Sequence, residues 1–109
     1  MGDAAATGIL RQLADASPDT FLPSLGTALN NLGIRLAEAG QRQAALAPAQ
    51  EAADTYRQLA DTNPDAYLPS LASALNNLGN RYSELGRRQD ALAPTEEAVQ
   101  LRRDRKSVV

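Results

Sequence analysis

The sequence contains no histidine, no cysteine and no tryptophan. Without cysteine there is no disulfide framework and no thiolate nucleophile. Without histidine there is no Ser-His or Cys-His catalytic pair and no imidazole metal site. The seven glycines all stand singly, so the chain has no glycine-rich phosphate-binding loop. We therefore expect a protein that is not an enzyme and that needs no cofactor and no metal.

Positive charge and long apolar runs are also scarce. The formal net charge is −2, whereas binding to nucleic-acid phosphates favours a basic surface, so no nucleic-acid partner is expected. No apolar run approaches the length of about 18 residues that a membrane-spanning helix needs, so no membrane association is expected. Residues 1–8 lack the basic region and apolar stretch of a signal peptide. These features favour a cytoplasmic protein.

What the chain does contain is a tandem repeat. Residues 13–58 align without a gap with residues 59–104, at a spacing of 46 residues, and 27 of the 46 positions are identical. A fixed period in this range is typical of repeat architectures, in which each unit buries its apolar face against its neighbours. Such arrays usually present a binding surface and seldom catalyse reactions.

Each repeat has the pattern of two helices. Apolar residues recur at a spacing of three and four within residues 25–36 and again within residues 45–59, and Gly40 stands where a left-handed cap would end the first helix. The pattern predicts an all-α fold of about five helices and no strands. We expect one domain over the whole chain, divided into a partial second helix (4–16), a first repeat (17–62) and a second repeat (63–106).

The positions of the small residues indicate which type of helical repeat this is. The motif of the first repeat is Leu32-Gly33-x-x-Leu36-x-x-x-Gly40 with Ala45 and Ala52, and its copy is Leu78-Gly79-x-x-Tyr82-x-x-x-Gly86 with Ala91 and Ala98. Both motifs resemble the tetratricopeptide repeat. The resemblance implies a solenoid of antiparallel helix pairs, in which the first glycine permits a close helix approach and the alanines fill the crossing. The unit is about 12 residues longer than the usual 34, which looks like the long-helix variant of bacterial tetratricopeptide proteins.

The resemblance also implies a groove lined by the first helices. At about 100° per residue, one side of each first helix carries a polar stripe. We expect these stripes to form a peptide-binding groove of Thr27, Asn30, Ile34, Glu38, Ser73, Asn76, Asn80 and Glu84. Asparagine is a poor helix former with two donors and an acceptor, so its repetition indicates hydrogen bonding to a ligand or to a neighbouring repeat. For the adjacent Asn31 and Asn77 we expect a bond to the neighbouring repeat.

The sequence thus predicts a protein- or peptide-binding module, the sensor or scaffold part of a larger bacterial protein. The alternative is a structural array that forms a homo-oligomer through its ends, because residues 4–16 are a lone second helix on which Ile9, Leu10 and Leu13 have an unfilled side. A third interpretation is an engineered or excised repeat pair without a ligand. Near the C-terminus, the charged run RRDRKS predicts a polar capping surface.

Overall fold

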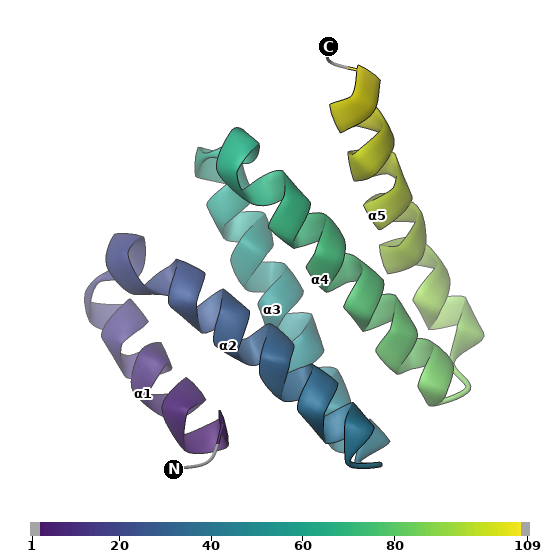
Figure 1. Cartoon of the computed structure of the whole chain (residues 1–109), viewed down its shortest axis with the longest axis horizontal. Coiled ribbons are helices and arrows are strands. Elements are labelled where there is room, and N and C mark those ends of the chain that lie inside the picture. The colour runs from purple at the N-terminus through teal and green to yellow at the C-terminus, as the bar shows by residue number, and fades with distance from the viewer. Residues whose placement is uncertain (1–2, 108–109) are drawn as a thin grey trace.

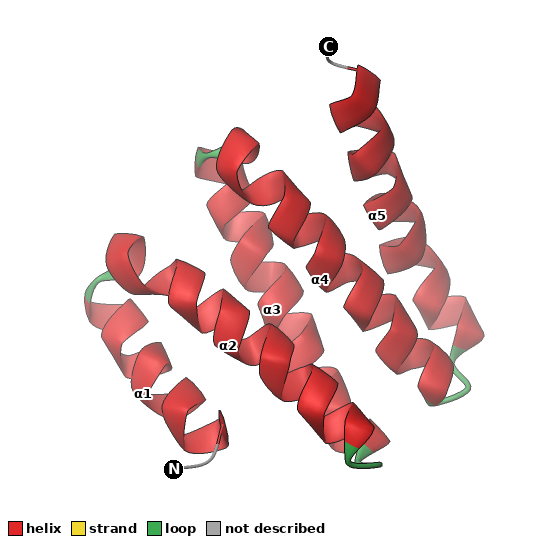
Figure 2. Ribbon diagram, viewed as in Figure 1, coloured by secondary structure: helices red, strands yellow, loops and turns green. Residues whose placement is uncertain are grey.

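The computed structural model describes residues 3–107 and, of their side chains, those of residues 4–103. The chain forms helices joined by short turns (Figure 2). The helices are α1 (Asp3–Ala16), α2 (Pro18–Glu38), α3 (Arg42–Thr62), α4 (Pro64–Glu84) and α5 (Arg88–Ser107). No strand occurs in this described part, so the predicted all-α fold of five helices is confirmed.

The helices form a flat slab of 43 × 36 × 16 Å in which each one packs against the next along the chain. Figure 1 shows α2 and α4 in front, α3 behind and between them, and α1 and α5 at the two sides. We call α2 and α4 the first helices and α1, α3 and α5 the second helices of successive repeats. The arrangement is a solenoid of antiparallel helix pairs, as the repeat pattern predicted.

The junctions are as regular as the repeat. A single residue separates one unit from the next, namely Ser17 (φ −141°, ψ 78°) and its counterpart Asn63 (φ −143°, ψ 77°). The proline that follows each of them disfavours helical dihedrals at the preceding residue and suits the first helical position. Within each unit, Gly40 (φ 83°) and Gly86 (φ 75°) end the first helix in the left-handed conformation. The predicted glycine cap is therefore confirmed.

The two helices of each repeat cross at a glycine. A Cβ atom on Gly33 would lie 3.3 Å from the carbonyl oxygen of Ala45 and 3.5 Å from the backbone nitrogen of Ala49. In the second repeat, a Cβ on Gly79 would collide with the Thr95 hydroxyl and lie 3.5 Å from the carbonyl oxygen of Ala91. The helices thus approach each other closely at both glycines, with the tight contact made by a backbone oxygen in the first repeat and by the Thr95 side chain in the second, as the glycine–alanine pattern predicted.

A second close contact, in the first repeat, involves Gly26 and Tyr56. A Cβ atom on Gly26 would lie 3.0 Å from Cζ of the Tyr56 ring, and the ring itself is buried. The counterparts in the second repeat are Ala72 and Arg102, and Arg102 is exposed. The buried Tyr56 ring therefore leaves room only for a glycine at position 26. In the second repeat the exposed Arg102 replaces the tyrosine, and the methyl group of Ala72 fits.

Arg–Glu pairs join successive second helices. Arg11 of α1 donates to Glu51 of α3 at 3.1 and 2.7 Å, and Arg57 of α3 donates to Glu97 of α5 at 2.5 and 3.0 Å. The hydrogen bonds to these carboxylates raise the pKa of both arginines. All four side chains are more than a third exposed, so each pair contributes at most about 1 kcal/mol to stability. The two pairs occupy equivalent positions of successive units, so the same contact is repeated along the array.

Replacing Gly33 by leucine should destabilise the fold by about 1–3 kcal/mol, because the crossing has no room for a side chain. The matched control is Gly8→Leu, since Gly8 also lies within a helix but a Cβ there meets nothing within 4 Å. We expect the control to be neutral or to stabilise by up to about 1 kcal/mol, from helix propensity alone. Urea unfolding followed by circular dichroism measures both. Equal effects of the two substitutions would contradict the close crossing.

Candidate binding surface

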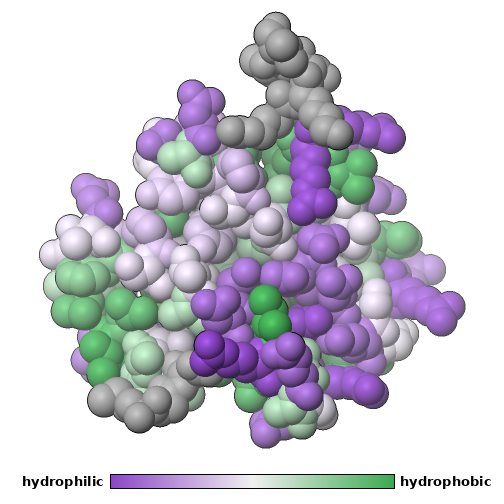
Figure 3. All heavy atoms as spheres, viewed as in Figure 1, coloured by the Kyte–Doolittle hydropathy of each residue, from purple (hydrophilic) through white to green (hydrophobic). Residues whose placement is uncertain are grey.

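All eight residues predicted for the groove lie on the first helices, and none of them is buried. These helices form the front layer in Figure 1. Figure 3 shows hydrophilic side chains gathered over the C-terminal halves of α2 and α4, around a small apolar spot. The structure therefore brings the two polar stripes onto one face of the slab, although their side chains do not all serve the same purpose.

Thr27 contributes to the packing of its own repeat. Its Oγ1 lies 2.8 Å from the hydroxyl of Tyr56 and donates to the carbonyl of Pro23 at 3.1 Å. The buried tyrosine of α3 thereby has a polar partner, which a buried hydroxyl requires. Thr27 thus holds the Tyr56 ring over Gly26, and its hydroxyl is already engaged within the repeat.

Asn30 forms a bridge between the repeats. Nδ2 of Asn77 donates to Oδ1 of Asn30 at 3.0 Å, so the two first helices are joined by one amide–amide hydrogen bond. The prediction that Asn77 bonds the neighbouring repeat is therefore confirmed. The same prediction for its counterpart Asn31 is wrong: Asn31 is exposed and has no side-chain hydrogen bond among the described residues, because no first helix precedes α2 in the described chain. The side-chain oxygen of Asn30 is thus used within the array.

Arg81 is a feature of this surface that the sequence analysis did not single out. It is only 8% exposed, and it donates to Glu84 at 2.7 and 3.3 Å. Asn77 and Arg81 are four residues apart and share the face of α4 that is turned towards α2. The counterpart Arg35, which has no first helix on that side, is exposed. The repeated Arg-x-x-Glu spacing was the sequence signal for this pair.

The side chain of Asn76 is half-buried, and its amide has no hydrogen-bond partner among the residues that the structure describes. Its polar atoms are open to solvent. It stands next to the Asn30–Asn77 bridge, and Ser73 and Asn80 lie exposed on the same side of α4, one turn before and one turn after it. A half-buried amide of this kind can bind a backbone carbonyl or amide of a ligand.

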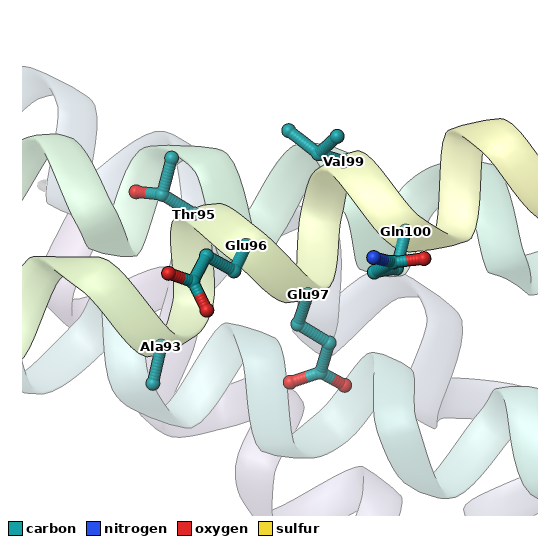
Figure 4. Close-up of a pocket in the computed structure, with 6 residues that line it drawn as sticks. All are labelled: Ala93, Thr95, Glu96, Glu97, Val99 and Gln100. Atoms are coloured by element: carbon teal, nitrogen blue, oxygen red, sulfur yellow. The ribbon is translucent and has the colours of Figure 1, made fainter.

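Three observations describe the rest of the surface. A shallow hollow of about 500 Å³ is lined by residues of α5 alone (Figure 4), namely Ala93, Thr95, Glu96, Glu97, Val99 and Gln100. Among the described side chains, no group of three or more acidic residues could hold a metal ion. No helix in the described part of the chain is long and apolar enough to cross a membrane.

Comparison with known proteins agrees with this geometry. The sequence profile described as Tetratricopeptide repeat matches residues 25–65 and 71–104, which is more than half of the chain. The chain belongs to the tetratricopeptide repeat family. Repeats of this family generally mediate protein–protein interactions or act as scaffolds. No curated protein and no solved structure matched the sequence.

The Asn30–Asn77 bridge predicts unequal costs for two equivalent substitutions. Asn77→Ala should lower the free energy of unfolding by about 0.5–1.5 kcal/mol, because it removes a half-buried inter-repeat hydrogen bond. Asn31→Ala, at the same position of the first repeat, removes an exposed amide and should leave stability unchanged or slightly raised. Urea titration of the two variants beside the parent chain measures the difference. A loss at Asn31 as large as that at Asn77 would show that the bridge contributes nothing specific.

Proposed function

We propose that this tetratricopeptide array is a protein- or peptide-binding module whose ligand lies along α2 and α4. The observation that carries the proposal is the half-buried Asn76 amide, which has unused donors and an acceptor beside the Asn30–Asn77 bridge. The Asn76 amide is open to solvent, so a ligand backbone that bonded it would replace a hydrogen bond to water, with a net gain of about 0.5–1.5 kcal/mol. The exposed Ser73 and Asn80 extend the same stripe along α4.

The charged side chains on this face favour a ligand of particular charge. Glu38 lies exposed at the end of α2, whereas the Glu84 carboxylate is already held by Arg81. A ligand carboxylate that sought Arg81 would have to displace Glu84 from a bidentate pair, and it would also meet the charge of Glu38. We therefore propose an extended neutral or basic segment, recognised through its backbone, and not an acidic C-terminus.

The proposal also concerns the larger protein to which the module belongs. By resemblance to the long-helix bacterial variant, the array is the sensor or scaffold part of a larger cytoplasmic bacterial protein and catalyses no reaction itself. Support comes from the family and from the architecture, since the regular helix pairs offer a broad surface.

A second candidate function is self-association through the ends of the array. Ile9 and Leu13 of α1 are 47% and 39% exposed, and Figure 3 shows apolar side chains gathered over α1. Burial of such side chains between copies would be favourable. Sedimentation velocity over a hundred-fold concentration range distinguishes the candidates, because a monomer throughout would exclude self-association.

Substitution of the adjacent Asn76 and Asn77 tests whether the groove binds a ligand. A peptide selected from a random phage library panned on the chain is titrated calorimetrically against the parent, Asn76→Ala and Asn77→Ala. Loss of one or two hydrogen bonds of about 0.5–1.5 kcal/mol each should weaken binding to Asn76→Ala by roughly ten-fold, with little change in stability. Asn77→Ala should instead lose stability. If the selected peptide bound Asn76→Ala normally, the groove proposal would be overturned.

A further inference from the structure

The guanidinium of Arg81 is recessed beside the junction of the two first helices. Arg81 is only 8% exposed, whereas its counterpart Arg35, which no first helix precedes in the described chain, is exposed. Arg81 stands one turn after Asn77, whose amide is bonded to Asn30 of α2, so both side chains lie on the face of α4 that is turned towards α2. An arginine is rarely buried to this degree unless a partner or a ligand compensates for the lost water.

Glu84 engages only part of this guanidinium. Its carboxylate accepts hydrogen bonds from Nε of Arg81 at 2.7 Å and from Nη2 at 3.3 Å. The third nitrogen of the guanidinium, Nη1, is also a donor, and it has no hydrogen-bond partner among the described residues.

Nη1 is nevertheless not sealed inside the array. Among the described residues, no side-chain nitrogen or oxygen is both shielded from solvent and without a hydrogen bond, so Nη1 of Arg81 reaches solvent. Glu84 belongs to the polar stripe of α4, and its side chain is 37% exposed. The guanidinium that it holds therefore opens on the same polar face, with one donor nitrogen available to a ligand.

The charge of the pair determines what this donor can bind. Arg81 and Glu84 together are electrically neutral, so a carbonyl oxygen can accept a hydrogen bond from Nη1 without bringing a second charge. A ligand carboxylate at Nη1 would meet the like charge of Glu84 at close range, and like charges repel. Glu84 also stands in the last turn of α4, where the helix dipole disfavours a further anion.

We propose that Arg81 and Glu84 together set the ligand specificity of the groove. Nη1 of Arg81 donates to a backbone carbonyl of the extended neutral or basic segment, and Glu84 keeps carboxylates away from the same nitrogen. The inference rests on the proposed function and goes beyond it by assigning a donor and the residue that selects against acids. Removal of the charge of Glu84 should therefore convert the recess into a site that accepts an anion.

The test of the selecting residue compares two glutamates at equivalent positions. Glu84→Gln releases Arg81 and keeps the length of the side chain. Glu38→Gln removes the same charge from the first repeat, where Glu38 is exposed and makes no hydrogen bond or ion pair with any described residue. Heteronuclear NMR spectra of the arginine Nε–H groups are recorded while sodium acetate replaces sodium chloride at constant ionic strength.

The signal of Arg81 is identified as the one that is lost in Arg81→Met. We expect acetate to shift this signal saturably in Glu84→Gln. Half-saturation should need roughly ten-fold less acetate than in the parent, because one like charge at close range no longer opposes binding. Glu38→Gln should respond as the parent does.

The donor role is tested with the peptide that phage panning selects. In the double variant Arg81→Met, Glu84→Gln, both members of the ion pair become neutral side chains of similar length, so neither charge is left without its partner. We expect the peptide to bind this variant roughly three- to ten-fold more weakly than the parent, because one hydrogen bond is lost. Arg35→Met is the control and should bind the peptide as the parent does.

Three outcomes would overturn the proposal. Equal acetate responses of the parent and Glu84→Gln would show that Glu84 does not exclude anions. No response of Arg81 in Glu84→Gln, when circular dichroism shows that this variant is folded, would show that the guanidinium is closed to ligands. Unchanged peptide binding by the double variant would remove the donor role, and this measurement decides the matter if Glu84→Gln does not fold. If no peptide bound the parent, the proposed function would fail, and the acetate titration would still test the pair by itself.

Discussion

The close approach of two helix backbones at Gly33 and Gly79 is the constraint on which the rest of the structure depends. At each crossing the partner helix offers backbone atoms or short side chains within about 3.5 Å of where a Cβ would lie. On both sides of the crossing, leucines of the two helices are buried in the common core. A regular spacing of small residues thus determines the pairing within each unit, and the 46-residue repeat reproduces it.

The environment of each side chain depends on which repeats lie before and after its own. Asn31 and Asn77, Arg35 and Arg81, and Leu46 and Leu92 are three pairs of identical residues at equivalent positions. In each pair one member lies against a neighbouring repeat and the other is more exposed. Burial in a solenoid is therefore a property of the position within the array and of its neighbours, since each unit contacts only the units before and after it.

Differences between the repeats are also informative. Tyr56 requires Gly26 beneath its ring and Thr27 beside its hydroxyl, whereas the second repeat replaces the tyrosine with an exposed arginine and the glycine with an alanine. Likewise Gln50 of α3, which donates to Tyr82 of α4, is replaced by Glu96 in α5, which no first helix follows in the described structure. Substitutions between the units are thus coupled through contacts, and they mark the places where the second repeat meets a different environment from the first.

The sequence by itself determined the helix pairs, their boundaries near proline and glycine, the small residues at the crossings and the family. These features are local or periodic, so spacing along the chain is sufficient to predict them. Only the tertiary structure decided which polar side chains are used within the array: it paired Asn77 with Asn30, held Glu84 with Arg81 and left Asn76 without a partner among the described residues. The physical reason is that the direction of a side chain around a helix follows from the sequence, whereas its hydrogen-bond partner depends on how far the neighbouring helix is displaced and rotated. The tertiary structure also shows that Leu92 and Val99, apolar at positions that are buried in α3, are exposed on α5, which no first helix covers in the described part of the chain.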